Sequence, residues 1–167
     1  MNGQPEFRRA ADDDWSAIWP VFGAVVAGGD TYTYPPDIDE TDARAAWMHV
    51  DHERAVTYVA SLDGGIVGTA LLKPVLPGLG DHVANAGWMI TPDVAGRGIG
   101  RRFAEFVIDE ARALGYVAMQ FNAVVATNER ALGLWRSLDF DEIGRIPAGF
   151  RHALHGPTDL VVMHRML

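Results

Sequence analysis

The sequence has 167 residues, 49% of them apolar and 22% charged, and its formal net charge is -8 at pH 7. This balance is typical of one globular domain, which we expect over residues 5–167, and the negative charge argues against a nucleic-acid partner, because such proteins need clustered lysine and arginine. The chain has no cysteine, which excludes disulfides and thiolate metal ligands. It has no apolar run near the roughly 20 residues that span a bilayer, which predicts a cytoplasmic protein without a membrane partner.

The first half of the chain predicts an edge strand, two helices and a β-hairpin. Three aspartates at 12–14 precede apolar residues at helical spacing, and Gly28-Gly29 stops that helix, with Pro20 predicting a kink or an earlier break. Residues 30–37 form an aromatic loop with two prolines. A second helix is expected at 39–50. The turn Asp63-Gly64-Gly65 joins β-rich runs at 55–62 and 66–73.

The second half alternates strands with helices before two closing strands. The expected elements are a strand at 83–90, a helix at 98–114, a strand at 118–125, a helix at 128–138 and strands at 140–146 and 160–166. The resulting order, β-α-α-β-β-β-α-β-α-β-β, predicts an α/β fold with a central mixed sheet and helices on both faces.

A glycine-rich loop at the start of the predicted helix 98–114 is the clearest sign of a ligand site. Gly96, Gly98 and Gly100 would let a ligand approach the backbone, and the free N–H groups of a helix start favour a phosphate or pyrophosphate. A Walker loop would need lysine after the last glycine, where Arg101 stands, and a dinucleotide fingerprint would need glycine at that same position. A plain strand-to-helix turn would not need three alternating glycines.

The segment resembles the signature of the GCN5-related N-acetyltransferase (GNAT) superfamily. Its pattern is Arg/Gln-x-x-Gly-x-Gly/Ala after a strand that ends in an aliphatic residue, any residue and proline. Gly98 and Gly100 match the small positions, and Ile90-Thr91-Pro92 matches the strand end. Ala95 stands where the family has Arg or Gln, which removes a side chain and leaves the backbone groups in place.

The second motif of the same family, Asn-x-x-Ala-x-x-x-Tyr-x-x-x-Gly-Phe, is similar to residues 128–140. Asn128, Ala131 and Phe140 match, whereas Trp135 replaces the tyrosine and Asp139 replaces the glycine. The two motifs occur in the family's order, and the resemblance extends over nearly the whole chain.

The resemblance implies a GNAT-like acyl-CoA N-acyltransferase fold and direct acetyl transfer, in a ternary complex, from acetyl-CoA to the primary amine of a small molecule, without a metal. Acetyl-CoA would lie in a splay between the strand ending at Ile90 and the strand from Ala118. The residues implied to bind it are Met89, Ile90, Ala95, Gly96, Arg97, Gly98, Ile99, Gly100, Arg101, Asn128 and Trp135.

Proton transfer and acceptor binding involve other residues. His82, and Asn122 through a bound water, are candidates for the base, beside carboxylates of the early helices; Trp135 cannot act as the family's tyrosine acid. Tyr32 and Tyr34 are expected to line the acceptor pocket. His49, His52 and Glu53 lack the order and the third ligand of a zinc site.

Two other functions remain open at this stage. One is acetylation of a protein or peptide, and the other is a non-catalytic acyl-CoA-binding module, which the absent tyrosine and the absent Arg or Gln both favour. The order Trp19, Phe22, Thr31, Trp47 is loosely similar to amino-acid and phosphinothricin acetyltransferases. The sequence fixes neither the acceptor nor the oligomeric state, and a homodimer stays open.

Overall fold

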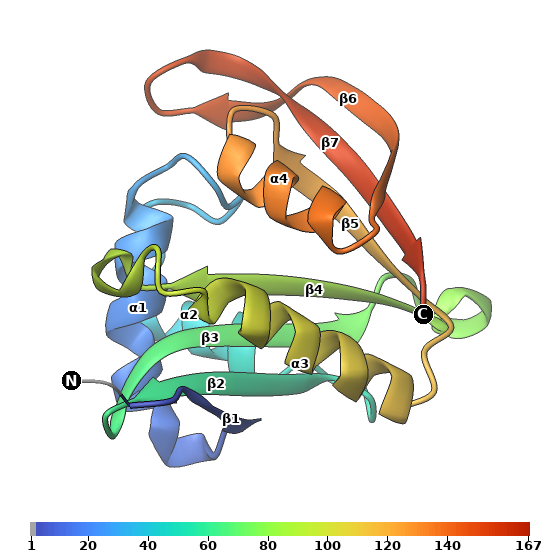
Figure 1. Cartoon of the computed structure of the whole chain (residues 1–167). Helices are drawn as coiled ribbons and strands as arrows, with labels where there is room; N and C mark the ends of the chain where they lie inside the picture. The colour runs from blue at the N-terminus through green and yellow to red at the C-terminus, as the bar shows by residue number, and fades with distance from the viewer. Residues whose placement is uncertain (1–2) are drawn as a thin grey trace.

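A computed structural model describes residues 3–167 and shows a seven-stranded sheet in the order β1-β2-β3-β4-β5-β7-β6 (Figure 1). Every neighbouring pair is antiparallel except β4 and β5, which run parallel. The strands are β1 (Glu6–Arg9), β2 (Val56–Leu62), β3 (Gly65–Pro74), β4 (Val83–Ile90), β5 (Ala118–Val125), β6 (Asp141–His152) and β7 (Gly156–Met166), and the α-helices are α1 (Trp15–Ala27), α2 (Glu40–Met48), α3 (Ile99–Ala113) and α4 (Glu129–Ser137).

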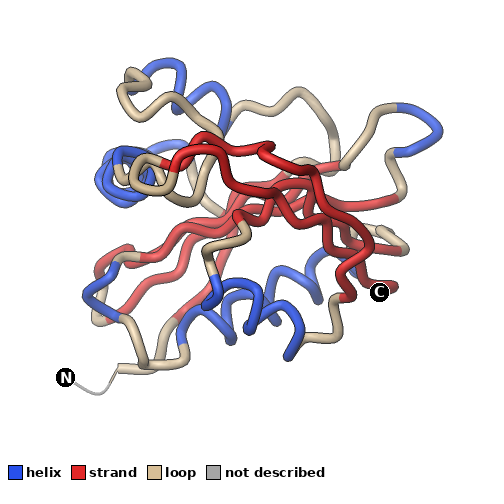
Figure 2. The backbone as a smooth tube through the Cα atoms, turned by 90° about the horizontal axis from the view of Figure 1, so that it is seen from above, coloured by secondary structure: helices blue, strands red, loops and turns tan. Residues whose placement is uncertain are grey.

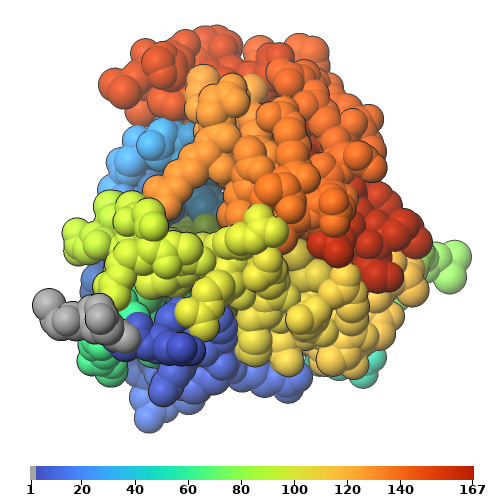
Figure 3. Space-filling model, in the orientation of Figure 1, coloured from blue at the N-terminus to red at the C-terminus, as the bar shows by residue number. Residues whose placement is uncertain are grey.

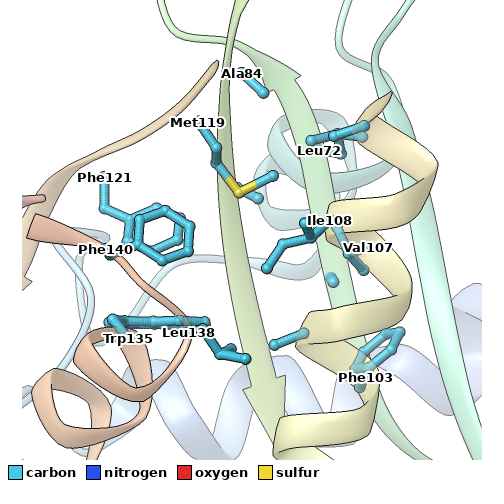
Figure 4. Packing of buried hydrophobic residues seen from close by; sticks show 14 of the residues in the cluster. Leu72, Ala84, Phe103, Val107, Ile108, Met119, Phe121, Trp135, Leu138 and Phe140 are labelled. Carbon is cyan, nitrogen blue, oxygen red and sulfur yellow. The ribbon is translucent and has the colours of Figure 1, made fainter. Parts of the chain in front are cut away.

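Helices cover both faces of the sheet, as the sequence predicts (Figures 1 and 2). On one face, Phe22 of α1 and Trp47 of α2 pack with Met89 of β4 in one buried cluster. On the other face, α3 and α4 bury a second cluster against the sheet, and Figure 4 shows Phe103 of α3 and Trp135 of α4 in it. The two clusters pack against opposite faces of the middle strands, so β4 is buried on both of its faces.

The strands β4 and β5 separate soon after they meet. They pair only at Val83 with Ala118 and at Ala84 with Met119, whereas β3 pairs with β4 from Pro74–Ala84 through Gly68–Ile90. Beyond these two pairs the strands diverge, and Figure 1 shows the gap widening toward the end of β4. The edge of β4 that faces this splay therefore lacks a neighbouring strand.

Two local predictions need correction. Of the two alternatives predicted at Pro20, a kink or an earlier break, the break is wrong. The helix α1 continues through Pro20 to Ala27, since its apolar face is buried along its length. The last two strands are longer than predicted and form one hairpin, because the apparent break at Pro147-Ala148-Gly149 is absorbed within β6, where the register shifts between Ile146 and Phe150 and Ala148 takes a φ of 52°.

Candidate active site

A cleft of about 1380 Å³ opens at the splay between β4 and β5. Its walls come from the loop before α3, the end of β4, the middle of β5, the start of α4, and the loop between α1 and α2. The space-filling view shows the hollow between the yellow-green segment before α3 and the orange segment before α4 (Figure 3). The cleft thus joins the predicted glycine loop and the predicted aromatic loop in one site.

The glycine loop forms one end of this cleft. Gly96 and Gly98 have φ values of 78° and 72°, a conformation that side chains disfavour, and Gly98 is the N-terminal cap of α3. Arg102 donates its N–H to the carbonyl of Gly98 at 3.2 Å, so the intrahelical bonds begin there. The N–H groups of the preceding turn, at Ile99 and Gly100, have no carbonyl within the helix to bind. They lie at the positive end of the helix dipole, an arrangement that favours an anion.

The side chains of the loop contribute less than its backbone. Ala95 and Arg97 are exposed, and Ala95 offers no polar group. The guanidinium of Arg101 donates to Ser137 Oγ at 2.8 Å and pairs with Glu105 at 3.0 Å. The Arg101 side chain therefore links α3 to α4, which leaves the backbone N–H as the group that this residue contributes to the helix start.

The free edge of β4 forms the wall of the cleft next to the glycine loop. Thr91 donates its N–H to Val67 of the strand β3 at 2.9 Å. Because successive residues of a strand direct their backbone groups to opposite sides, Met89 also faces β3, whereas Trp88 and Ile90 face the splay. The geometry of Ile90 is compatible with its predicted role. Met89 also lines the cleft, but its side chain is 1% exposed and its backbone faces Thr69 of β3, so Trp88 and not Met89 presents backbone groups to the splay beside Ile90.

Aromatic rings from α4 and the sheet close the base of the cleft. The ring of Trp135 lies 4.7 Å from those of both Trp88 and Phe121, between centroids, and is 7% exposed. Asn128 caps α4, since its side-chain oxygen accepts the N–H of Ala131 at 3.1 Å. Both Asn128 and Trp135 line the cleft, and each also has a structural task.

The predicted aromatic loop forms the opposite wall. Tyr32 donates its hydroxyl to the carbonyl of Trp88 at 2.8 Å, and its ring stacks on Tyr34 with centroids 6.1 Å apart. Burial raises the pKa of Tyr32 far above its usual value, so the phenol stays protonated. Gly87 makes this approach feasible, because a Cβ there would lie 3.0 Å from the Tyr32 hydroxyl.

The two predicted base residues have different surroundings. Asn122 lines the cleft and accepts a hydrogen bond from Gln120 at 2.7 Å. His82 precedes β4 at the closed end of the splay, where its carbonyl accepts the N–H of Val117. Eight residues of extended chain put it about 26 Å from Ile90, and it is not among the residues that line the cleft. The prediction that His82 faces the site is wrong, because the strand carries it to the other end.

Two cleft residues, Lys73 and Asn85, are missed by the sequence motifs. They lie opposite each other on β3 and β4, and Asn85 donates its side-chain amide to the carbonyl of Gln120 at 2.9 Å. This bond bridges β4 and β5 just beyond their last paired residues. No family motif covers either residue, and only their alternation with the buried Leu72 and Ala84 could have placed them on one face.

The Nε2 atoms of His49 and His52 lie near separate carboxylates, those of Asp12 at 3.2 Å and Asp81 at 3.9 Å. Residues 3–167 contain no group of three or more His, Cys, Asp or Glu side chains arranged to hold a metal ion. Within the same residues, none of the helices combines the length and apolar character needed to cross a membrane.

Comparison with known proteins gives a consistent result. The model of the acetyltransferase (GNAT) family matches residues 14–140. The solved structure of a GCN5-related N-acetyltransferase from Kribbella flavida is 44% identical, with a TM-score of 0.92 and 98% of both chains covered. A phosphinothricin acetyltransferase from Sinorhizobium meliloti, solved with acetyl-CoA, is 20% identical and shares the fold, with a TM-score of 0.87 over 98% of this chain and 88% of its own.

Among curated proteins, N-acetyltransferase aca1 of Schizosaccharomyces pombe is 35% identical over 89 residues, which cover 52% of this chain and 43% of the relative. The chain therefore matches less than half of the length of aca1. Together with the family match, these likenesses confirm the predicted fold and family.

Proposed function

This chain belongs to the acetyltransferase (GNAT) family, and on that premise we propose that it transfers the acetyl group of acetyl-CoA to the primary amine of a small molecule. The observation that carries the proposal is the cleft, because it joins an anion site at the start of α3 to an unpaired strand edge and an aromatic pocket. These three parts fit the pyrophosphate, the pantetheine arm and the acceptor in that order.

The fit to acetyl-CoA rests on the backbone. The pyrophosphate would accept the N–H groups of Ile99, Gly100 and Arg101, with positive φ at Gly96 and Gly98 opening the loop. No heavy atom lies within 4 Å of a Cβ built on either of these two glycines, so the approach is clear. The replacement of Arg or Gln by Ala95 removes no part of this cradle.

The amide-rich pantetheine arm matches the free edge of β4. The N–H of Trp88 and the N–H and C=O of Ile90 face the splay and can pair with it as a missing strand would, whereas the Trp88 carbonyl already accepts the Tyr32 hydroxyl. One of these N–H groups would also polarise the thioester carbonyl, and a well-placed donor of this kind contributes roughly 3 kcal/mol to transition-state stabilisation.

The transfer itself needs no covalent enzyme intermediate. The amine nitrogen attacks the thioester carbon, the C–N bond forms, the C–S bond breaks, and the sulfur departs as a thiolate. Trp135 cannot protonate the sulfur, since an indole N–H is not a practical acid, so water supplies that proton; a thiol pKa near 8.5 makes this acceptable. The proton lost by the amine leaves through water held at Asn122.

The acceptor wall favours a small molecule over a peptide. Tyr32 spans from the α1–α2 loop to the Trp88 carbonyl, and Ala153 of the β6–β7 hairpin donates its N–H to Gly29 at 3.0 Å. These two contacts hold the α1–α2 loop over the end of the cleft. An extended peptide would need this end of the cleft to be open.

A thiol-release assay with acetyl-CoA and a panel of amino acids, polyamines, aminoglycosides and peptides tests the proposal. We expect release with small amines and formation of the N-acetyl product by mass spectrometry. Release with peptides alone would make the chain a peptide acetyltransferase. Tight acetyl-CoA binding by calorimetry with no release for any amine would instead indicate a non-catalytic acyl-CoA-binding module.

A further inference from the structure

Lys73 is the only lysine in a chain that otherwise uses arginine. It lies near the end of β3, is half-buried, and lines the cleft. Its neighbour Leu72 packs on the α3 side of the sheet, whereas Leu71 packs under α1 and α2. Because side chains alternate along a strand, Lys73 shares the face of Leu71, which is the face of the acceptor wall and not that of α3.

Within the part of the chain that the structure describes, the ammonium of Lys73 has no carboxylate partner. Among residues 3–167, none of the ion pairs involves it, although eight of the arginines form such pairs. The other cations that line the cleft, Arg101 and Arg130, belong to α3 and α4 at the cofactor end. A half-buried cation without a partner, in a chain with a net charge of -8, marks a place for an anion that the protein does not supply.

The neighbours of Lys73 give this anion a defined position. Asn85 lies directly opposite on β4, and its amide is held on Gln120. Gly87 lies two residues beyond Asn85 on the same face of β4, about 7 Å away. The ring of Tyr32 packs over Gly87. The cation and the amide therefore lie side by side on neighbouring strands, and the phenol lies two residues further along β4, toward the Trp88 carbonyl where the amine would meet the thioester.

We propose that Lys73 binds a carboxylate of the acceptor, so that the substrate is a small amine that also carries a carboxylate. This inference rests on the proposed acetyl transfer and names its substrate class. Lys73 would attract the anionic end while its charge lowers the pKa of the nearby substrate ammonium, which favours the neutral amine that attacks. The same charge repels polyamines and aminoglycosides.

The test compares each acceptor with its own uncharged analogue. Thiol release is measured for glycine, β-alanine, leucine, methionine, phenylalanine and glutamate, for their carboxamides, and for spermidine. The variants are Lys73→Met, which keeps length and removes charge, Lys73→Arg, which keeps charge, and Arg130→Met as a control that removes a cleft cation on the cofactor side.

We expect the wild type to prefer acids over carboxamides in kcat/KM by about 10- to 100-fold, the range of a charge-assisted contact. Lys73→Met removes this preference without weakening acetyl-CoA binding, Lys73→Arg retains part of it, and Arg130→Met leaves the acid-to-amide ratio unchanged.

Three results would overturn the proposal: a preference for carboxamides or spermidine in the wild type, an unchanged ratio in Lys73→Met, or an equal loss of the ratio in Arg130→Met. Failure of the acetyl-transfer proposal is distinct, because no amine would then release thiol although acetyl-CoA binds.

Discussion

The strongest test of the anion site is a pair of glycine substitutions with equal strain. Gly98, at the cap of α3, and Gly64, in the β2–β3 turn, have φ values of 72° and 85°, and a Cβ on either would have no heavy atom within 4 Å. An alanine at each position would cost about 1 kcal/mol through its left-handed conformation alone. For a chain of this size, that cost lowers Tm by about 2–4 °C.

The two variants should differ in binding. A methyl group on Gly98 would occupy the space through which the pyrophosphate approaches the helix start, and charge-assisted hydrogen bonds there contribute about 1.5–3 kcal/mol. Gly98→Ala should therefore raise the Kd for coenzyme A by about 10- to 100-fold. Gly64→Ala, which does not line the cleft, should leave the Kd within about twofold of the wild type.

Isothermal titration calorimetry with coenzyme A gives the Kd values. Thermal denaturation without ligand gives the Tm, and its decrease reports the cost of the strained backbone. Gly98→Val should remove binding while the protein remains folded. If Gly98→Ala and Gly64→Ala lose affinity equally, backbone strain accounts for the loss and the glycine loop is not the anion site.

Three further substitutions test separate parts of the structure. Trp135→Phe should change turnover by less than about tenfold at unchanged acetyl-CoA affinity, and Trp135→Tyr should raise turnover by supplying an acid; a loss beyond a hundredfold in Trp135→Phe would contradict the water route. Asn128→Ala should cost about 1 kcal/mol of unfolding free energy, as should the matched cap variant Asp39→Ala, but only the first should weaken acetyl-CoA binding. The hydrogen bond from Arg8 lowers the pKa of Asp14. The contribution of the ionised Asp14 to the free energy of unfolding is therefore present above pH about 4 and is lost as pH falls through the folded pKa. Urea midpoints should show that Asp14→Asn is less stable than the wild type at pH 7 and equally stable in acid.

The sequence predicts most of the fold because the decisive signals are local. The turn at Asp63 and Gly64, both with positive φ, is a local preference, and it joins the two predicted strands. The strands 83–90 and 118–125 have the predicted bounds. The sequence predicts a shorter β6–β7 hairpin, because proline and glycine near Ala148 are typical of a break. Only the pairing with β7 shows that β6 continues through this segment.

The candidate site is less predictable, since its geometry depends on register. A motif places Met89 and Ile90 together at a strand end, but only the pairing of β4 with β3 decides that Ile90 and Trp88 face the cleft. The same strand direction removes His82 from the site. Sequence proximity to a motif is therefore a weak guide to which groups a ligand meets.

Gly87 shows how a residue without chemistry of its own can define a pocket. In the sequence it is a glycine inside a buried strand, where glycine costs stability relative to a larger residue. In the fold, a Cβ at this position would lie 3.0 Å from the hydroxyl of Tyr32 and 3.3 Å from the ring of Trp47, so even a methyl group would force its neighbours to shift by a few tenths of an ångström. A larger side chain would push the tyrosine off the strand. The hydroxyl would then lose its hydrogen bond to the carbonyl of Trp88, which is 56 residues away along the chain. The aromatic loop predicts Tyr32 as a pocket residue from its own neighbours along the chain, but nothing near Gly87 in the sequence indicates its role. The contact between the two residues, and with it the proposed acceptor wall, forms only when the α1–α2 loop packs on β4.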